Sequence, residues 1–434
     1  MTVSPEPIGT LTAGVPRVTT EGGRKTVSAD VTYEGDSKVL RFTVSEGTLE
    51  GRGDAFLAAL LPPAMKRESR LTVAGGVSPR LLAATRTIQE IFWKWHPETQ
   101  RVPIVADPRR SSAPPGSREV GCFFSGGVDS FYSLLKHQDE VTTLILVHGF
   151  DVALEDHDLW GKVSKEIREV ACELGKGIVE VETNLRSITD PIVDWNDLFG
   201  CALASVALAL APRFERVLVP SSNSYGYMEP HGSHPLLDPL WSTEDMEIVH
   251  DGGEADRDEK VARIAGHESV SRHLRVCWRN TGGAYNCGKC EKCLRTMICL
   301  LAVGGLDRCT TFESGLNEAA VAAMEITSGP LLRFAEENLR RLERTAAPSG
   351  VSRGLRASIE RYRSRLVGRE IGAVGASLVQ SPEWMNARDD VLQAIWETQR
   401  RWLCQSIFEK GLKAARRAVS AGPLPRLLSR RPRP

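Results

Sequence analysis

The chain has 434 residues, enough for a large apolar core, and its 55 basic side chains are balanced by 55 acidic ones. Net charge therefore favours neither a nucleic acid nor a membrane as partner. No secretion signal is visible near the N-terminus, and the most apolar stretch, 198–211, is too short to span a bilayer and predicts a buried helix. We expect a cytoplasmic protein with no membrane association, whose ten cysteines remain reduced.

The N-terminal quarter of the chain predicts a flexible segment followed by a small α+β domain. Residues 1–24 are rich in proline and glycine without periodicity. Two alternating apolar runs then predict a β-hairpin at the start of a domain over 25–106. One helix is expected to end at Pro62 and Pro63, and a second to begin after Ser78 as its N-cap. A proline-rich linker follows at 107–118.

A short apolar run at 120–124 is followed by a serine–glycine turn and an amphipathic segment. This pattern of strand, glycine turn and helix start directs backbone N–H groups and the positive end of a helix at an anion. Adjacent glycines let the chain approach phosphate closely, and serine hydroxyls add donors. The alternative is a glycine turn that binds nothing. We predict a phosphate-binding loop made by Ser125, Gly126, Gly127, Val128, Asp129 and Ser130.

The same six residues resemble the signature of the PP-loop ATP pyrophosphatases. They lack the Lys-Ser/Thr ending of the Walker motif and the spaced glycines of the dinucleotide fingerprint. The resemblance implies an adenine nucleotide alpha-hydrolase-like fold that binds ATP by its β,γ-pyrophosphate and uses it to adenylate a substrate. A carboxylate beside phosphate repels the ligand unless a cation lies between them, so Asp129 predicts Mg²⁺. Asp129 and Ser130 are the expected catalytic residues.

Strands and helices alternate after residue 119, which predicts an α/β domain with a doubly wound parallel sheet over 119–306. Ligands on such sheets lie beyond the carboxyl ends of the strands. The loops expected to converge there are 125–130, 148–151, 184–186 and 221–225.

A polar segment at 226–268 has no clean periodicity. It predicts either a substrate lid or a solvated loop, and we favour the lid. No single histidine or acid within it stands out as a catalyst.

Four cysteines near the end of this domain predict a metal site. Cys287, Cys290 and Cys293 are spaced C-x2-C-x2-C on a glycine turn, and Cys277 lies within a short run at 274–278 that predicts a strand. Four thiolates form a closed tetrahedral zinc site, which braces a structure and leaves no position for water. An iron–sulfur cluster and four unligated thiols are the alternatives.

The glycine loop, a late Ser-Ser pair and the four cysteines together resemble the 7-cyano-7-deazaguanine synthase family over about 120–306. The resemblance implies structural zinc on the cysteines, and ATP activation of a carboxylate that ammonia converts to an amide and then a nitrile. It also implies that His148 and Asp151 lie at the base and ribose, with Ser221 and Ser222 among the nucleotide-binding residues. The flanking regions are additional to that family.

The last third of the chain predicts helices over 307–408, interrupted at Gly350 and Gly354, and a basic tail over 409–434. The tail could contact RNA or an acidic partner, but we favour a solvated tail because no aromatic residues are interleaved for base stacking. The N- and C-terminal extensions are candidate docking surfaces for a partner protein.

The leading functional hypothesis is a ligase that adenylates a substrate carboxylate with ATP and then joins it to ammonia or another amine, with release of AMP and pyrophosphate. The amine would come from solution or from another protein, since no glutaminase constellation is evident. One alternative is sulfur transfer to a nucleic acid base. Another is a non-catalytic nucleotide-binding scaffold in a multiprotein defence or conjugation system.

Overall fold

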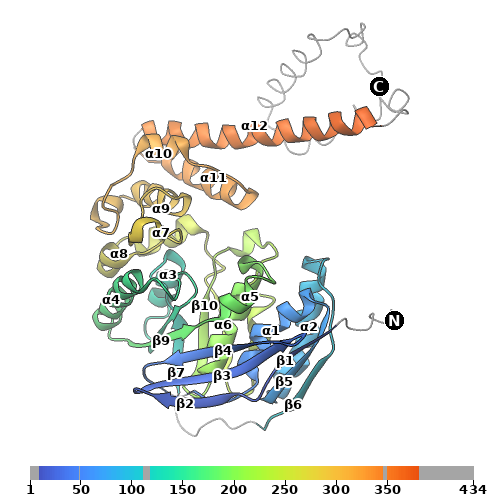
Figure 1. Cartoon of the computed structure of the whole chain (residues 1–434). Helices are drawn as coiled ribbons and strands as arrows, with labels where there is room; N and C mark the ends of the chain where they lie inside the picture. The colour runs from blue at the N-terminus through green and yellow to red at the C-terminus, as the bar shows by residue number, and fades with distance from the viewer. Residues whose placement is uncertain (1–8, 48, 111–117, 346–348, 381–434) are drawn as a thin grey trace.

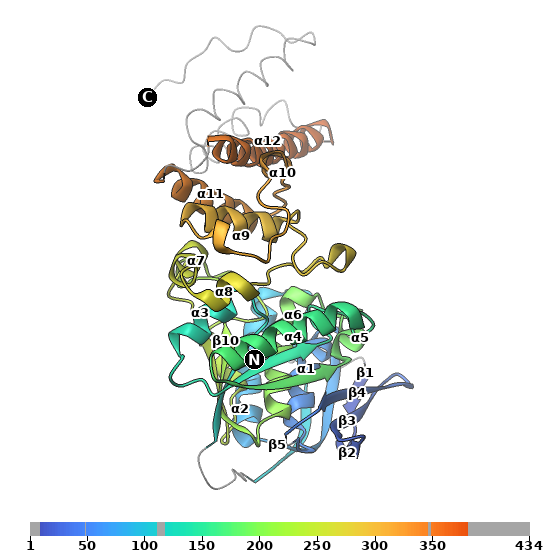
Figure 2. The same cartoon turned by 90° about the vertical axis from the view of Figure 1, so that its left-hand side faces the viewer.

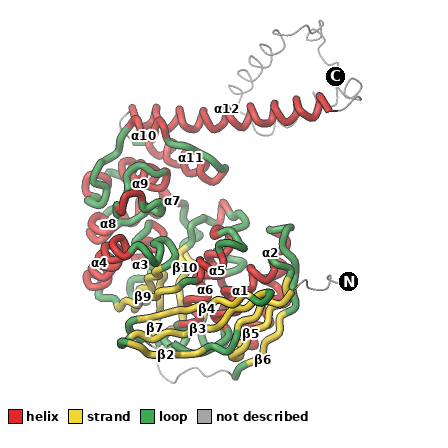
Figure 3. The backbone as a smooth tube through the Cα atoms, viewed as in Figure 1, coloured by secondary structure: helices red, strands yellow, loops and turns green. Residues whose placement is uncertain are grey.

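The computed structural model of the protein describes residues 9–47, 49–110, 118–345 and 349–380. These residues form an eleven-stranded mixed, mostly parallel sheet and a C-terminal helical region stacked over one end of the sheet (Figure 1). The strands gather at the opposite end of the molecule from the long last helix (Figure 3). At this level the predicted α/β fold with a helical C-terminal region is confirmed.

The strands in chain order are β1 (Gly9–Ala13), β2 (Arg17–Glu21), β3 (Arg24–Tyr33), β4 (Asp36–Val44), β5 (Ser69–Val77), β6 (Ile104–Pro108), β7 (Glu119–Phe123), β8 (Thr143–His148), β9 (Gly177–Thr183), β10 (Phe214–Pro220) and β11 (Glu247–Asp251). The α-helices are α1 (Asp54–Lys66), α2 (Pro79–Trp95), α3 (Val128–Lys136), α4 (His157–Glu173), α5 (Leu185–Thr189), α6 (Trp195–Ala209), α7 (Arg257–Ile264), α8 (Glu268–His273), α9 (Glu291–Ala302), α10 (Glu318–Ala323), α11 (Gly329–Glu343) and α12 (Ser349–Gln380). Four 3-10 turns are η1 (Tyr225–Tyr227), η2 (Asp238–Trp241), η3 (Thr281–Gly283) and η4 (Leu306–Arg308).

The N-terminal strands are not a separate unit, because they extend the same sheet. Strand β4 pairs antiparallel with β9, with Phe42 opposite Thr183, so the sheet crosses the boundary that the sequence placed at 107–118. The hairpin β3–β4 is confirmed. The prediction of a flexible segment over 1–24 is wrong for its described part, because β1 and β2 each pair with β3. Backbone pairing compensates there for the weak local pattern.

Helix α1 runs through Pro62 and Pro63, which the sequence analysis wrongly expected to end it. Residues 54–65 of this helix are all buried, and the helix packs between the sheet and α6. Burial of apolar surface on all sides outweighs the loss of two backbone N–H donors. Helix α2 begins as predicted, since Ser78 accepts a hydrogen bond from the backbone N–H of Leu81.

The five strands after residue 118 are parallel to one another, in the order β11-β10-β7-β8-β9. Their alternate residues enter two different apolar clusters on the two faces of the sheet. Cys122 and Leu144 pack in the cluster that includes α3 and α4, whereas Phe123 and Ile145 pack in the cluster that includes α6. Helices therefore cover both faces. Strands β7, β8 and β10 are parallel, and α3, which follows β7, packs against α7 (Figure 2), so the carboxyl ends of these strands face the α7 end of the molecule.

Three further predictions need correction. The segment 226–268 contains β11 and α7, so it is an extension of the sheet as well as a loop. Residues 274–278 form no strand. Helix α12 includes both Gly350 and Gly354. The basic tail and the helical positions beyond 380 lie outside the described residues. None of the helices that the structure describes has the length and apolarity to cross a membrane.

Candidate functional site

The predicted strand, glycine turn and helix are present at the centre of the parallel strands. Strand β7 ends at Phe123 and α3 begins at Val128, with Gly127 as its N-cap. Gly126 has a φ of +74°, and a Cβ there would lie 3.0 Å from Cδ1 of Ile167. The carbonyl of Gly126 accepts a hydrogen bond from the backbone N–H of Arg275 (2.8 Å). A residue with a Cβ would be strained at this position, so the turn before α3 requires glycine.

Asp129 lies in the first turn of α3 and is paired with two cations from α7. One carboxylate oxygen is 2.9 Å from Nη1 of Arg257, and the other is 3.3 Å from Nζ of Lys260. Burial would raise the pKa of Asp129, but Arg257, Lys260 and then Lys292 outweigh it and lower that pKa to about 2. Asp129 is therefore ionised at neutral pH.

The cations around Asp129 outnumber the carboxylates. Arg257, Lys260 and Arg295 are buried, and Lys292 is half-buried. Burial and then repulsion by Arg257 lower the pKa of Lys292, and the same two causes lower the pKa of Arg295 to about 10. Glu291 pairs with Arg295 at 3.1 Å. The surplus positive charge destabilises this site unless an anion is bound.

Two donor groups of Arg257 are a second indication that this site binds an anion. Its Nη1 pairs with Asp129, but its buried Nε and Nη2 have no hydrogen-bond acceptor among the described residues. A buried guanidinium normally uses its planar set of donors on carboxylate or phosphate oxygens. The arrangement can therefore bind an oxyanion between the glycine loop and the start of α7.

Two predicted serines are used within the protein, and two are exposed. The buried hydroxyl of Ser130 donates to the carbonyl of Gly127 (3.0 Å), and the hydroxyl of buried Ser221 donates to the carbonyl of Asn223 (2.6 Å). Ser125 and Ser222 are exposed.

Lys260 links the loop that follows β10 to the glycine loop. Lys260 donates to the carbonyl of Ser221 (2.5 Å) and also pairs with Asp129. Its ammonium group therefore joins the carboxyl end of β10 to the first turn of α3.

His148 and Asp151 lie at the end of β8, where the strand pattern placed them. The ring of His148 stacks on Trp160 at 4.2 Å, and its Nε2 contacts the carbonyl of Ala153 at 3.1 Å. Burial lowers the pKa of His148, which keeps the ring neutral at pH 7. Asp151 is exposed, and its carbonyl accepts from Asn280. No described contact joins His148 to the glycine loop.

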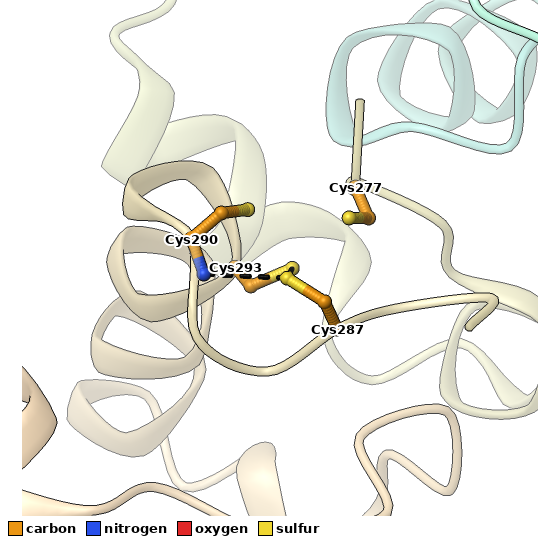
Figure 4. Close-up of side chains that lie close together, drawn as sticks. All are labelled: Cys277, Cys287, Cys290 and Cys293. Atoms are coloured by element: carbon orange, nitrogen blue, oxygen red, sulfur yellow. Dashed lines mark hydrogen bonds between the residues drawn. The ribbon is translucent and has the colours of Figure 1, made fainter. Parts of the chain in front are cut away.

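The four predicted cysteines converge on one point (Figure 4). All four sulfur atoms lie within 4.8 Å of one another, and Sγ of Cys287 is 3.9 Å from Sγ of Cys293. A tetrahedral ion with metal–sulfur distances of about 2.3 Å requires about 3.8 Å between sulfurs. The cluster therefore fits one zinc ion, and a polynuclear iron–sulfur cluster would need the thiols further apart.

Local hydrogen bonds favour the thiolate form of one of these cysteines. The backbone N–H of Cys290 donates to Sγ of Cys287 (3.3 Å), and a hydrogen bond with the Cys293 thiol lowers the pKa of Cys290 to about 5. Helix α9 begins at Glu291, directly after Cys290, and Lys292 lies between two of the cysteines. The cysteine cluster thus fixes the helix that carries Lys292 and Arg295.

The sequence analysis missed the cations that surround Asp129. Arg257 and Lys260 both lie in the polar segment 226–268, and neither was singled out. A signal was available, since Asp256 and Glu259 form a capping box that predicts a helix starting at Arg257.

No protein-family model, curated protein or solved structure matches this chain.

Proposed function

We propose that this protein is an ATP-dependent ligase of the PP-loop type, which adenylates a carboxylate and passes the acyl group to ammonia or another amine. The observation that carries the proposal is the surplus of cations beside Asp129, which follows the glycine loop in the first turn of α3. A triphosphate supplies the negative charge that this site lacks, and the loop supplies backbone donors.

The strand order supports the same site for a nucleotide. We interpret β9-β8-β7-β10-β11 as a doubly wound parallel sheet, in which the connections reverse direction between β7 and β10. Ligands bind outside the carboxyl ends of the strands at such a reversal. The glycine loop follows β7, and Ser221 follows β10, so both flank this position.

Asp129 does not fit the role of a magnesium ligand as the side chains lie. Both of its oxygens are engaged by Arg257 and Lys260, and no second carboxylate is among its described contacts. A direct Mg²⁺ ligand would have to release one of these cations. Magnesium would therefore reach the site on the phosphates of ATP, while Asp129 orients Arg257 and Lys260.

Zinc fits the cysteine cluster, where Cys277, Cys287, Cys290 and Cys293 would hold it. Bound there it supplies a structural crosslink, because all four positions of a tetrahedral ion are taken by thiolates. Its effect on the reaction would be to keep Lys292 and Arg295 at the start of α9 in place.

The chemistry rests on positioning and charge stabilisation. With the outer two phosphoryl groups held by the loop, by Arg257 and by Lys260, the substrate carboxylate attacks the α-phosphorus and pyrophosphate leaves. The surplus cations stabilise the negative charge that develops on the phosphate oxygens. An amine then displaces AMP from the acyl-adenylate, and the resulting amide is the first product.

The test is incubation of the purified protein with α-labelled ATP, Mg²⁺ and a panel of acids that includes 7-carboxy-7-deazaguanine. Acid-dependent formation of AMP supports adenylation. ADP as the nucleotide product overturns it in favour of phosphoryl transfer. Tight nucleotide binding without turnover for any acid or amine supports the scaffold alternative.

A further inference from the structure

Helix α11 brings an arginine from the helical region to the end of β10. The side chain of Arg333 is 13% exposed, and its Nη2 lies 3.3 Å from the side-chain oxygen of Asn223. Its guanidinium carbon stacks 4.2 Å from the ring centre of Tyr227, in the loop after β10. Residues more than a hundred positions apart are thus joined at the carboxyl end of the sheet, where α7, α9 and α11 lie side by side (Figures 1 and 2).

A second guanidinium shares an aromatic ring with Arg333. The guanidinium carbon of Arg295 is 4.1 Å from the ring centre of Phe334, and that of Arg333 is 4.8 Å from the same centre. Two like charges beside one ring repel each other, which is unfavourable unless an anion lies between them or next to them. Stacking fixes both planes and leaves their edges as hydrogen-bond donors.

The nearby carboxylates do not balance these two arginines. Glu337 lies 3.5 Å from Nε of Arg333, but burial raises the pKa of Glu337 to about 7, so it is only partly ionised at neutral pH. Glu291 pairs with Arg295 at 3.1 Å, so this one carboxylate is the described counter-ion of Arg295. A net positive charge therefore extends from the glycine loop toward α11.

We infer that Arg333 and Arg295 form a second anion subsite, which takes the carboxylate of the acid that is activated. The inference rests on the proposed function. Arg257 and Lys260 pair with Asp129 and serve the phosphates, whereas Arg333 makes no described contact with Asp129 and lies against Asn223 and Tyr227 in the loop after β10. The planar guanidinium group of an arginine can bind a planar carboxylate by two parallel hydrogen bonds. The helical region is then part of the active site.

The experiment measures two probes separately on the full chain. The nucleotide probe is α,β-methylene-ATP, and the carboxylate probes are benzoate and 7-carboxy-7-deazaguanine, added with and without the nucleotide. Arg333→Gln and Arg295→Gln should each weaken carboxylate binding about tenfold or more, and change nucleotide affinity less than about threefold. Arg333→Lys, which keeps the charge without the planar fork, should lie between. Arg344→Gln, an exposed position at the end of the same helix, is the control and should match wild type.

The outcomes separate the two proposals. Carboxylate affinity that is equal in wild type and Arg333→Gln, or that is absent from wild type, overturns the subsite. An equal loss of nucleotide affinity in Arg333→Gln assigns the arginines to phosphate and also overturns it. If wild type binds benzoate through Arg333 but does not bind the nucleotide, the subsite stands and the ligase proposal fails. Circular dichroism and zinc content establish that each variant is folded.

Discussion

Two of the buried charge clusters among the described residues differ in their balance of positive and negative charge. In the first, Arg109 contacts Asp54 at 2.8 Å and Asp245 at 2.7 Å, and Arg52 contacts Asp245 at 3.0 Å. Each cation there meets a carboxylate, and the cluster joins the N-terminal strands to the loop before β11. We call this the balanced cluster. In the second, the surplus cluster, the cations around Asp129 outnumber the acids; they are Arg257, Lys260, Lys292 and Arg295.

The pKa values of Asp54 and Asp129, one carboxylate from each cluster, reflect this difference in charge balance. Burial raises the pKa of Asp54 despite its hydrogen bonds with Ser78 and Arg109, whereas the cations around Asp129 lower its pKa to about 2 in spite of burial. An unpartnered arginine nitrogen does not separate the clusters, because Nη2 of Arg109 also has no hydrogen-bond acceptor in the described part of the chain. The balance of charge does. A matched network serves folding, and a surplus of one sign indicates a ligand.

The largest expected effect comes from the cysteine cluster, because a zinc ion bound there would hold α9 in place, and α9 carries Lys292 of the surplus cluster. Cys290→Ser should lose stoichiometric zinc and lower the free energy of unfolding by an amount on the order of 5 kcal/mol. It should also weaken binding of α,β-methylene-ATP, since α9 carries Lys292, one of the cations beside Asp129. Elemental analysis, urea unfolding and calorimetry measure these changes. Exposed Cys172→Ser is the control. Unchanged zinc content in Cys290→Ser would falsify the four-thiolate site.

Breaking the balanced cluster should affect stability alone. Arg109→Met leaves Asp54 and Asp245 with less compensation, so the free energy of unfolding should fall by about 3–5 kcal/mol. Nucleotide affinity should remain within about twofold of wild type, because the network makes no described contact with the glycine loop. Exposed Arg110→Met is the matched control. A large loss of nucleotide affinity in Arg109→Met would remove the distinction between the clusters.

A substitution in the surplus cluster should weaken nucleotide binding and leave stability nearly unchanged. Arg257→Met should weaken α,β-methylene-ATP binding about a hundredfold, since a charge-assisted contact to phosphate is worth about 2–3 kcal/mol. Stability without ligand should change by less than about 1 kcal/mol, because removal of one cation relieves repulsion on Lys292 and Arg295. Arg263→Met, exposed on the same helix, should bind normally. Nucleotide affinity equal to wild type in Arg257→Met would contradict the phosphate site.

The smallest effect is a pH dependence with opposite signs in the two clusters. The depressed pKa of Asp129 contributes about 2 kcal/mol above pH 3.8, and this is lost as the pH falls toward 2. The stability difference between wild type and Asp129→Asn should therefore shrink on acidification. The pKa of Asp54 is raised, so its contribution is lost as the pH rises, and the difference from Asp54→Asn should grow on acidification. Urea unfolding between pH 2.5 and 6 measures both, and parallel trends would refute the contrast.

Local sequence determined much of this protein. Alternating apolar residues predicted the hairpin β3–β4, Ser78 predicted the start of α2, and the glycine turn predicted the strand and helix that flank it. The spacing of three cysteines predicted a cluster that Cys277 completes. Each of these signals depends on residues close together in the chain, where spacing alone fixes geometry.

Tertiary structure decided what lies far apart in the chain. Burial keeps α1 helical through Pro62 and Pro63, and pairing of β4 with β9 merges the predicted N-terminal domain with the parallel strands. The cations of Asp129 come from a helix some 130 positions later, so the charge that surrounds it could not be counted from the sequence. Charge balance is a property of a volume, and only the folded chain defines which side chains share that volume.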